Sequence, residues 1–286
     1  MSGDSWMDGS RFLETDERKH DLPNTYDKFM AYLKPDIMYY LPKFFHDSTA
    51  DDILNPWNST QCVMAAQAGS MLRNRSVPGG PNNPANDIAI RDTVTEHDRI
   101  VVHVSGNDLH QSCILPQVLY GKSRQAIIQG LWNGSLEREV IDALRTLWRE
   151  NFPRYLKFLT ERKKPKEIIL LGLPRTRPGY FRNHIGINAV LGNSFLASSG
   201  TTAIVNIFYG SLLQASFPVL RDTLEEIKNG SPQLQGIRIT ALSTNDVLRG
   251  DETPELYNQR DNLHPNWRGS EALARELYDR IITSPP

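Results

Sequence analysis

The sequence predicts an α/β fold with helices on both faces of a mostly parallel sheet. Three segments, 99–104, 167–173 and 237–242, are rich in β-branched and other apolar residues, as expected of strands buried on both faces of a parallel sheet. Segments with apolar residues at helical spacing lie between and after them. Because strands that alternate with helices of this length are joined by right-handed crossovers, we expect a three-layer α/β/α sandwich.

The helices of this sandwich are predicted from apolar periodicity. One helix over about 136–147 follows from four residues at helical spacing, namely Leu136, Val140, Leu144 and Leu147. The same pattern resumes after Pro153. A second helix is expected over about 202–228, with a break at Pro218, and a third over about 270–282.

The length and composition predict a single globular domain. An α/β fold of 286 residues can form around one continuous core, and we expect one domain, 1–286, with insertions at about 10–60 and 116–165. The chain is 39% hydrophobic and 23% charged, and its 32 lysine and arginine residues nearly balance its 33 aspartate and glutamate residues. This balance does not indicate a nucleic-acid or membrane partner, and the oligomeric state stays open.

The cysteines and apolar segments give an expectation for the location of the protein. Cys62 and Cys113 are too few for a disulfide framework or a cysteine-based metal site, which favours a reducing compartment. The amino end has no charged region followed by an apolar run, and no apolar segment reaches about 18 residues. We therefore expect a soluble intracellular protein with no integral membrane segment. The sequence also lacks metal-site patterns and a Gly-rich phosphate loop, so we expect no metal and no cofactor.

A short polar segment near the carboxyl end, 261–265 (Asp-Asn-Leu-His-Pro), places a carboxylate three residues before a histidine. At that spacing Asp261 can accept a hydrogen bond from His264 and fix the tautomer that a catalytic base needs. The alternative is a surface turn followed by the start of a helix. Two other segments favour catalysis, because residues 3–9 offer a serine nucleophile and residues 105–108 offer a polar donor.

Asn107 lies three residues after the first predicted strand, 99–104. In open parallel sheets, catalytic and binding groups gather at the carboxyl ends of the strands. An asparagine amide can stabilise an oxyanion because it donates hydrogen bonds without carrying charge. The alternative is a capped turn at the end of a strand.

Four short segments, taken in order, resemble the sequence blocks of the SGNH hydrolase family, also called GDSL esterases and lipases. They are Gly-Asp-Ser at 3–5 with Gly9, Ala-Gln-Ala-Gly-Ser at 66–70, Ser-Gly-Asn-Asp at 105–108 and Asp-Asn-Leu-His-Pro at 261–265. The resemblance covers the whole chain, although only the blocks are specific. It implies the SGNH hydrolase fold, in which the parallel sheet is flavodoxin-like.

The resemblance also implies a role for each matching residue. Ser5 corresponds to the nucleophile, His264 to the base that takes its proton and Asp261 to the residue that orients the histidine. The oxyanion formed on attack is held in this family by the positions of the Ser5 backbone N–H, the Gly69 backbone N–H and the Asn107 side-chain amide. These roles agree with general chemistry, since a serine hydroxyl needs an adjacent base and a stabilised tetrahedral intermediate.

The sequence departs from the family pattern in two places. The family has a buried apolar strand immediately before its Gly-Asp-Ser, and only two residues precede that motif here. We therefore expect this upstream first strand to be missing, replaced by another segment or encoded before Met1. The family usually has glycine where this chain has Ser105, which alters the turn but keeps the amide donor. Gly79 and Gly80 are alternatives to Gly69 in the oxyanion site.

The function expected from these residues is hydrolysis of a carboxylic ester through a serine acyl-enzyme. The substrate would be a lipid, an acetylated carbohydrate or a small acyl ester. One alternative is an acyltransferase that uses the same triad, in which an alcohol replaces water. Another is an SGNH-like binding module without activity, which the short amino end would favour.

Two further residue sets have a structural interpretation. His103 lies inside a predicted buried strand and is expected to be a core histidine. An aromatic cluster, Tyr39, Tyr40, Phe44, Phe45 and Trp57, precedes the second block. These aromatic residues could line an acyl-binding surface, but a helix core is the favoured interpretation.

Overall fold

The computed structural model describes residues 2–3, 36–49, 60–63, 70–77, 85–110, 114–177, 199–259 and 264–283. In this part of the chain, four strands form one sheet in the order β1-β2-β3-β4, and every pairing is parallel. The strands are β1 (Ser2–Gly3), β2 (Arg99–His103), β3 (Glu167–Leu171) and β4 (Arg238–Leu242). The three strands predicted from the sequence are therefore confirmed, with ends shifted by at most two residues.

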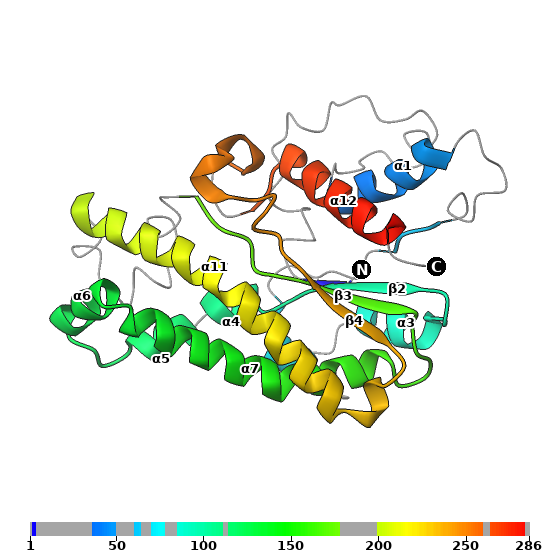
Figure 1. Ribbon diagram of the computed structural model, residues 1–286, viewed down its shortest axis with the longest axis horizontal. Coiled ribbons are helices and arrows are strands. Elements are labelled where there is room, and N and C mark those ends of the chain that lie inside the picture. The colour runs from blue at the N-terminus through cyan, green and yellow to red at the C-terminus, as the bar shows by residue number, and fades with distance from the viewer. Residues whose placement is uncertain are drawn as a thin grey trace.

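Helices surround this sheet (Figure 1). They are α1 (Ile37–Thr49), α2 (Leu72–Arg75), α3 (Ala85–Thr93), α4 (Gly106–His110), α5 (Ile114–Leu119), α6 (Arg124–Trp132), α7 (Ser135–Leu159), α11 (Ser199–Gly230) and α12 (Trp267–Ile282). The described residues also form three short 3-10 helices, η4 (Pro232–Leu234), η5 (Gly250–Glu252) and η6 (Pro254–Leu256).

The sheet has an apolar core on each face. Successive residues of a strand point to opposite faces, so one strand can contribute to both cores. Even-numbered residues of β2 and β3 pack with α7 and α11, namely Ile100, Val102, Ile168 and Leu170. Odd-numbered residues pack with α1 and α12, namely Val101, Ile169 and Leu171. Figure 1 shows these two helix pairs on opposite sides of the strands, which confirms the three-layer α/β/α sandwich.

Pro153 and Pro218 lie inside the two longest helices that the structure describes, α7 and α11. The helix expected over 136–147 continues through Pro153 to form α7, and α11 continues through Pro218, so the predicted break there was wrong. A proline removes one backbone hydrogen bond and introduces a steric clash. Both helices nevertheless pack against each other over a long contact, and α7 buries residues from its first turn to its last. Tertiary packing therefore outweighs the local helix-breaking tendency of proline.

The aromatic residues of α1 form part of the second core. Tyr40, Phe44 and Phe45 are buried, and the Phe45 ring lies 5.1 Å from the ring of Tyr278 in α12. Helix α1 packs along α12. The helix-core interpretation is thus confirmed for α1, while Trp57 lies outside the described residues. His103 is 2% exposed, as expected of a core histidine.

Glu167 joins the strands at the amino edge of the sheet. Its carboxylate, 1% exposed, lies 3.3 Å from Arg99 Nε of β2 and 3.4 Å from Arg238 Nε of β4, which are its partners in register. Arg280 Nη2 of α12 approaches the same carboxylate at 3.3 Å. One buried charge therefore fixes three strands and a helix.

Replacing Glu167 by glutamine tests this arrangement. We expect Glu167→Gln to lower the free energy of unfolding by about 3–5 kcal/mol, because the arginines lose the charge that compensates their own partial burial. Urea denaturation measures the change. Glu226→Gln is the matched control, since the Glu226–Arg149 pair is solvent-exposed and its loss should change little. Equal effects of the two substitutions would contradict the central role of Glu167.

Candidate active site

The turn between β2 and α4 carries Asn107. It begins at Ser105, the one non-glycine residue of the described chain that has a positive φ, at 89°. A side chain in this region is strained, whereas glycine is not. The backbone at this position therefore has the conformation for which glycine is favoured.

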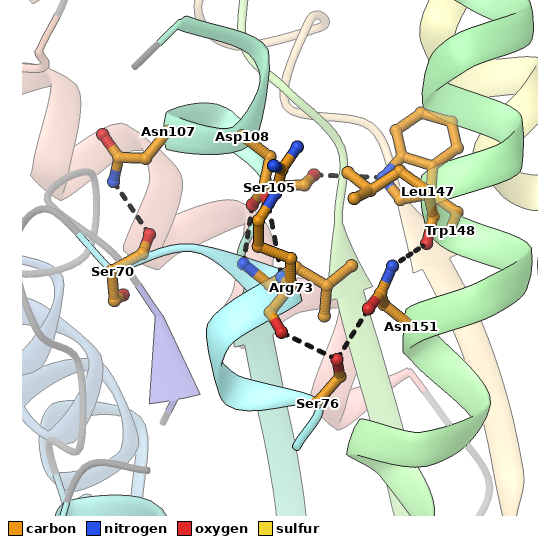
Figure 2. Close-up of polar contacts among 10 residues, drawn as sticks. Ser70, Arg73, Ser76, Ser105, Asn107, Asp108, Leu147, Trp148 and Asn151 are labelled. Atoms are coloured by element: carbon orange, nitrogen blue, oxygen red, sulfur yellow. Dashed lines mark hydrogen bonds and ion pairs between the residues drawn. The ribbon is translucent and has the colours of Figure 1, made fainter. Parts of the chain in front are cut away.

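The side chain of Ser105 makes a bond that a glycine could not. Its Oγ accepts a hydrogen bond from Trp148 Nε1 of α7 at 3.1 Å (Figure 2). Ser105 is 2% exposed and Trp148 is 1% exposed. A buried indole N–H without an acceptor is costly, so this bond offsets part of the backbone strain and fixes the turn to α7.

Asn107 connects the turn to the second sequence block. Its Nδ2 donates to the carbonyl oxygen of Ser70 at 3.0 Å (Figure 2). Ser70 directly follows Gly69, which lies outside the described residues. The structure thus brings the third block to the residue that ends the second, although the two are 37 positions apart.

Asp108, the next residue, binds the same segment through its carboxylate. Oδ2 accepts from the Leu72 backbone N–H at 2.6 Å, and Oδ1 accepts from the backbone N–H and the Nε–H of Arg73, each at 3.3 Å. The Asp108 side chain is fully buried. Burial raises the pKa of this carboxyl group, and the N–H groups of Leu72 and Arg73 counteract part of the rise.

The other end of α2 is anchored to α3 and α7. Arg75 Nη1 donates to both carboxylate oxygens of Asp87, at 2.9 and 3.0 Å, and to the Tyr155 hydroxyl at 3.2 Å. All three side chains are buried. The Ser76 hydroxyl donates to Asn151 Oδ1 of α7 at 2.6 Å. Hydrogen bonds to α3, α4 and α7 therefore hold residues 70–76 along the segment.

The turn that carries His264 is fixed by the amino end of α12. His264 is 6% exposed, and its carbonyl oxygen accepts from the Asn258 N–H at 2.9 Å. Asn266 caps α12, since its Oδ1 accepts from the N–H groups of Arg268 and Gly269. Its Nδ2 donates back to the carbonyl oxygens of Glu255 and Tyr257. One amide therefore joins the segment before the histidine to the helix after it.

Tyr257 links this turn to the carboxyl end of β3. Its hydroxyl donates to the Arg175 carbonyl oxygen at 2.6 Å and accepts from the Gly250 N–H at 2.8 Å. Burial raises the pKa of the hydroxyl, so it remains a donor. Tyr257 also pairs with Pro265, the residue after His264. In Figure 1, α4 and the amino end of α12 both lie toward the left, where the strands have their carboxyl ends.

The predicted site residues are described in part. Asn107 and His264 are in the described chain and both are buried, while Ser5, Gly69 and Asp261 lie outside it. Gly3, two residues before Ser5, ends β1 and pairs with His103 at the end of β2.

Four supporting residues were missed by the sequence reasoning, namely Arg73, Asp108, Trp148 and Tyr257. Asp108 adjoins Asn107 in the third block, so its place in that block could have identified it as a supporting residue. The other three contact the site region across distant parts of the chain and have no local pattern.

Among the described residues, no group of three or more His, Cys, Asp or Glu side chains is placed to hold a metal ion. None of the helices that the structure describes is both long enough and apolar enough to span a membrane.

The comparisons with known proteins concern the fold. No family model and no curated protein matches the sequence. The structure is similar to that of the lipase Lip_vut3 from a goat rumen metagenome, with 16% identity, 97% of this chain and 94% of that chain covered, and a TM-score of 0.50. An extracellular lipase from Streptomyces rimosus is also similar, with 12% identity, 97% of both chains covered and a TM-score of 0.48. The first likeness shows a shared α/β fold.

Substitutions of Ser105 separate its backbone strain from its hydrogen bond. Ser105→Ala keeps the strain and leaves Trp148 Nε1 without its acceptor, so we expect a loss of about 1–3 kcal/mol in unfolding free energy. Ser105→Gly loses the same bond but relieves the strain, and should be about 1 kcal/mol more stable than the alanine variant after allowing for glycine's unfolded-state entropy. Chemical denaturation measures both, and an alanine variant as stable as the glycine variant would disprove the strain.

Proposed function

We propose that the protein is a serine ester hydrolase with Ser5 as nucleophile, His264 as general base and Asp261 as the residue that orients His264. The observation that carries the proposal is the parallel register of β1 with β2, in which Gly3 lies beside His103. Ser5 follows Gly3 by two residues and Asn107 follows His103 by four. Strands β1 and β2 therefore end at the same edge of the sheet, which is where sites form in parallel α/β folds, and the proposal puts Ser5 near Asn107 at that edge.

The proposed reaction proceeds in two steps. The Ser5 hydroxyl oxygen attacks the ester carbonyl carbon while His264 takes the hydroxyl proton, and the tetrahedral intermediate then expels the alcohol, which receives that proton. Water attacks the resulting acyl-enzyme, again giving its proton to His264. The carboxylic acid is released and Ser5 regains its proton. No cofactor takes part.

The proposed oxyanion site uses three N–H donors, from the Ser5 backbone, the Gly69 backbone and the Asn107 side chain. A primary amide carries two N–H groups, so the bond from Asn107 to Ser70 and a bond to an oxyanion use different hydrogens. The Ser70 bond supports the proposal because it joins the Asn107 turn to the residue after Gly69. The ester-hydrolase proposal is also in keeping with the fold shared with the lipase Lip_vut3. Its substrate would be a lipid, acetylated carbohydrate or small acyl ester.

A fluorophosphonate probe tests the nucleophile and the base. We expect wild-type protein to be labelled at Ser5 and Ser5→Ala to give no labelling there. Hydrolysis of p-nitrophenyl acetate should fall by about a millionfold in Ser5→Ala or His264→Ala, because triad members act as a unit. Ser10→Ala and His97→Ala are controls at a nearby serine and an exposed histidine. A wild-type protein that does not label would reject the hydrolase and favour a binding module.

Replacing Asn107 by alanine tests the oxyanion donor. We expect kcat for p-nitrophenyl acetate to fall by about a hundredfold to a thousandfold while Ser5 labelling stays detectable, since the nucleophile and base are retained. Steady-state kinetics measures the change. Asn133→Ala, at an exposed helix end, serves as the control. An unchanged kcat would remove Asn107 from the proposed oxyanion site.

Supplying glycerol or a sugar during turnover distinguishes hydrolysis from acyl transfer. A hydrolase should release free acid with at most a trace of new ester. Predominant formation of the alcohol's ester, detected by mass spectrometry, would identify an acyltransferase that uses the same residues.

A further inference from the structure

Two neighbouring side chains of α4 hold one short segment by opposite kinds of hydrogen bond. Asn107 donates to the Ser70 carbonyl oxygen, and Asp108 accepts from the Leu72 and Arg73 N–H groups. The segment is thus bound through an acceptor at one end and donors at the other. Figure 2 shows Ser70 and Arg73 facing the α4 residues in this way.

The Asp108 carboxylate supplies the hydrogen-bond acceptor for the first N–H groups of α2. The residue before α2, Met71, makes no side-chain capping bond. The first N–H groups of a helix have no partner within the helix and need one from elsewhere. The Asp108 carboxylate provides it from 35 and 36 residues away, in a fully buried position. The place of α2 relative to Asn107 is therefore set by this side chain.

We propose that Asp108 and Arg73 are positioning residues of the oxyanion site, and this inference rests on the function proposed above. Asp108 acts through residues 70–73 and through its neighbour Asn107. It fixes the Asn107 amide relative to Ser70, the residue that follows the proposed donor Gly69. Donors that are already in place at the moment of reaction stabilise charge more strongly than donors that must be reoriented.

The positive charge of Arg73 contributes to the same arrangement. A carboxylate next to an oxyanion site would repel the negative charge that develops on the substrate oxygen. The Arg73 guanidinium, with Nε 3.3 Å from Asp108 Oδ1, offsets that charge. Its side chain is 36% exposed, so Arg73 can be replaced with less disturbance than the buried Asp108.

The principal test is Asp108→Asn, assayed with p-nitrophenyl acetate. The amide has the shape of the carboxylate, but its nitrogen would present hydrogens to one of the N–H donors of Leu72 and Arg73. We expect kcat to fall by about tenfold to a hundredfold, because small displacements of catalytic groups are costly, with KM within about twofold of wild type. Arg73→Met should lower kcat by about threefold to tenfold in the same way.

A double-mutant cycle with Asn107→Ala shows whether Asp108 acts through the oxyanion donors. If it does, Asp108→Asn should lower kcat by about threefold or less in the Asn107→Ala background, because the donor that Asp108 positions is already absent. Fully additive losses, an unchanged kcat, or a raised KM with normal kcat would each overturn the proposal. If Asp108→Asn does not fold, the same cycle with Arg73→Met decides.

Glu167→Gln is the matched control for loss of stability. It makes the same acid-to-amide change at a buried, arginine-paired carboxylate, but at the amino edge of the sheet. Circular dichroism at the assay temperature gives the folded fraction, and kcat per folded molecule should be unchanged in this control. A fall in kcat equal to that of Asp108→Asn would overturn the positioning role.

The two proposals fail in different ways. If wild-type protein is not labelled by fluorophosphonate and does not turn over the ester, the hydrolase proposal fails. If wild type labels and turns over but the Asp108 and Arg73 variants behave as wild type, the positioning role alone fails.

Discussion

Parallel pairing between β1 and β2 governs where each candidate catalytic group can lie. Because parallel strands run in one direction, β1 and β2 both end at the same edge of the sheet, with Gly3 beside His103. Tyr257 then ties the turn of His264 to the segment after β3, so a third part of the chain is bound to this edge.

A buried carboxylate has a different structural role at each edge of the sheet. At the amino edge, Glu167 is surrounded by arginines from neighbouring strands and α12, and the result is cohesion between layers. At the carboxyl edge, Asp108 accepts three N–H bonds from a short helix that has no cap of its own. Burial of that carboxylate and the positive φ of Ser105 both cost stability, and hydrogen bonds offset part of each cost.

The elements with a strong apolar pattern were predictable. Strands β2, β3 and β4 are short, nearly continuous apolar runs, and α12 has apolar residues at helical spacing, so local sequence suffices to identify them. The break expected at Pro218 does not occur, because packing against α7 outweighs a single lost hydrogen bond. Helix α2 has only four residues, and part of its stabilisation comes from a side chain 35 or more positions away. Such a helix leaves no periodic signal.

For the candidate site, the sequence by itself determined the chemical groups and their order: a serine, an amide and an Asp-x-x-His turn, with the amide shortly after a buried strand. Only the tertiary structure decided which groups support them. The side chain of Ser105 bonds to Trp148 and that of Asn107 to Ser70, while the Asp108 carboxylate accepts from Leu72 and Arg73. These contacts join segments far apart in sequence, and their geometry is fixed by sheet register and helix packing rather than by any local residue pattern.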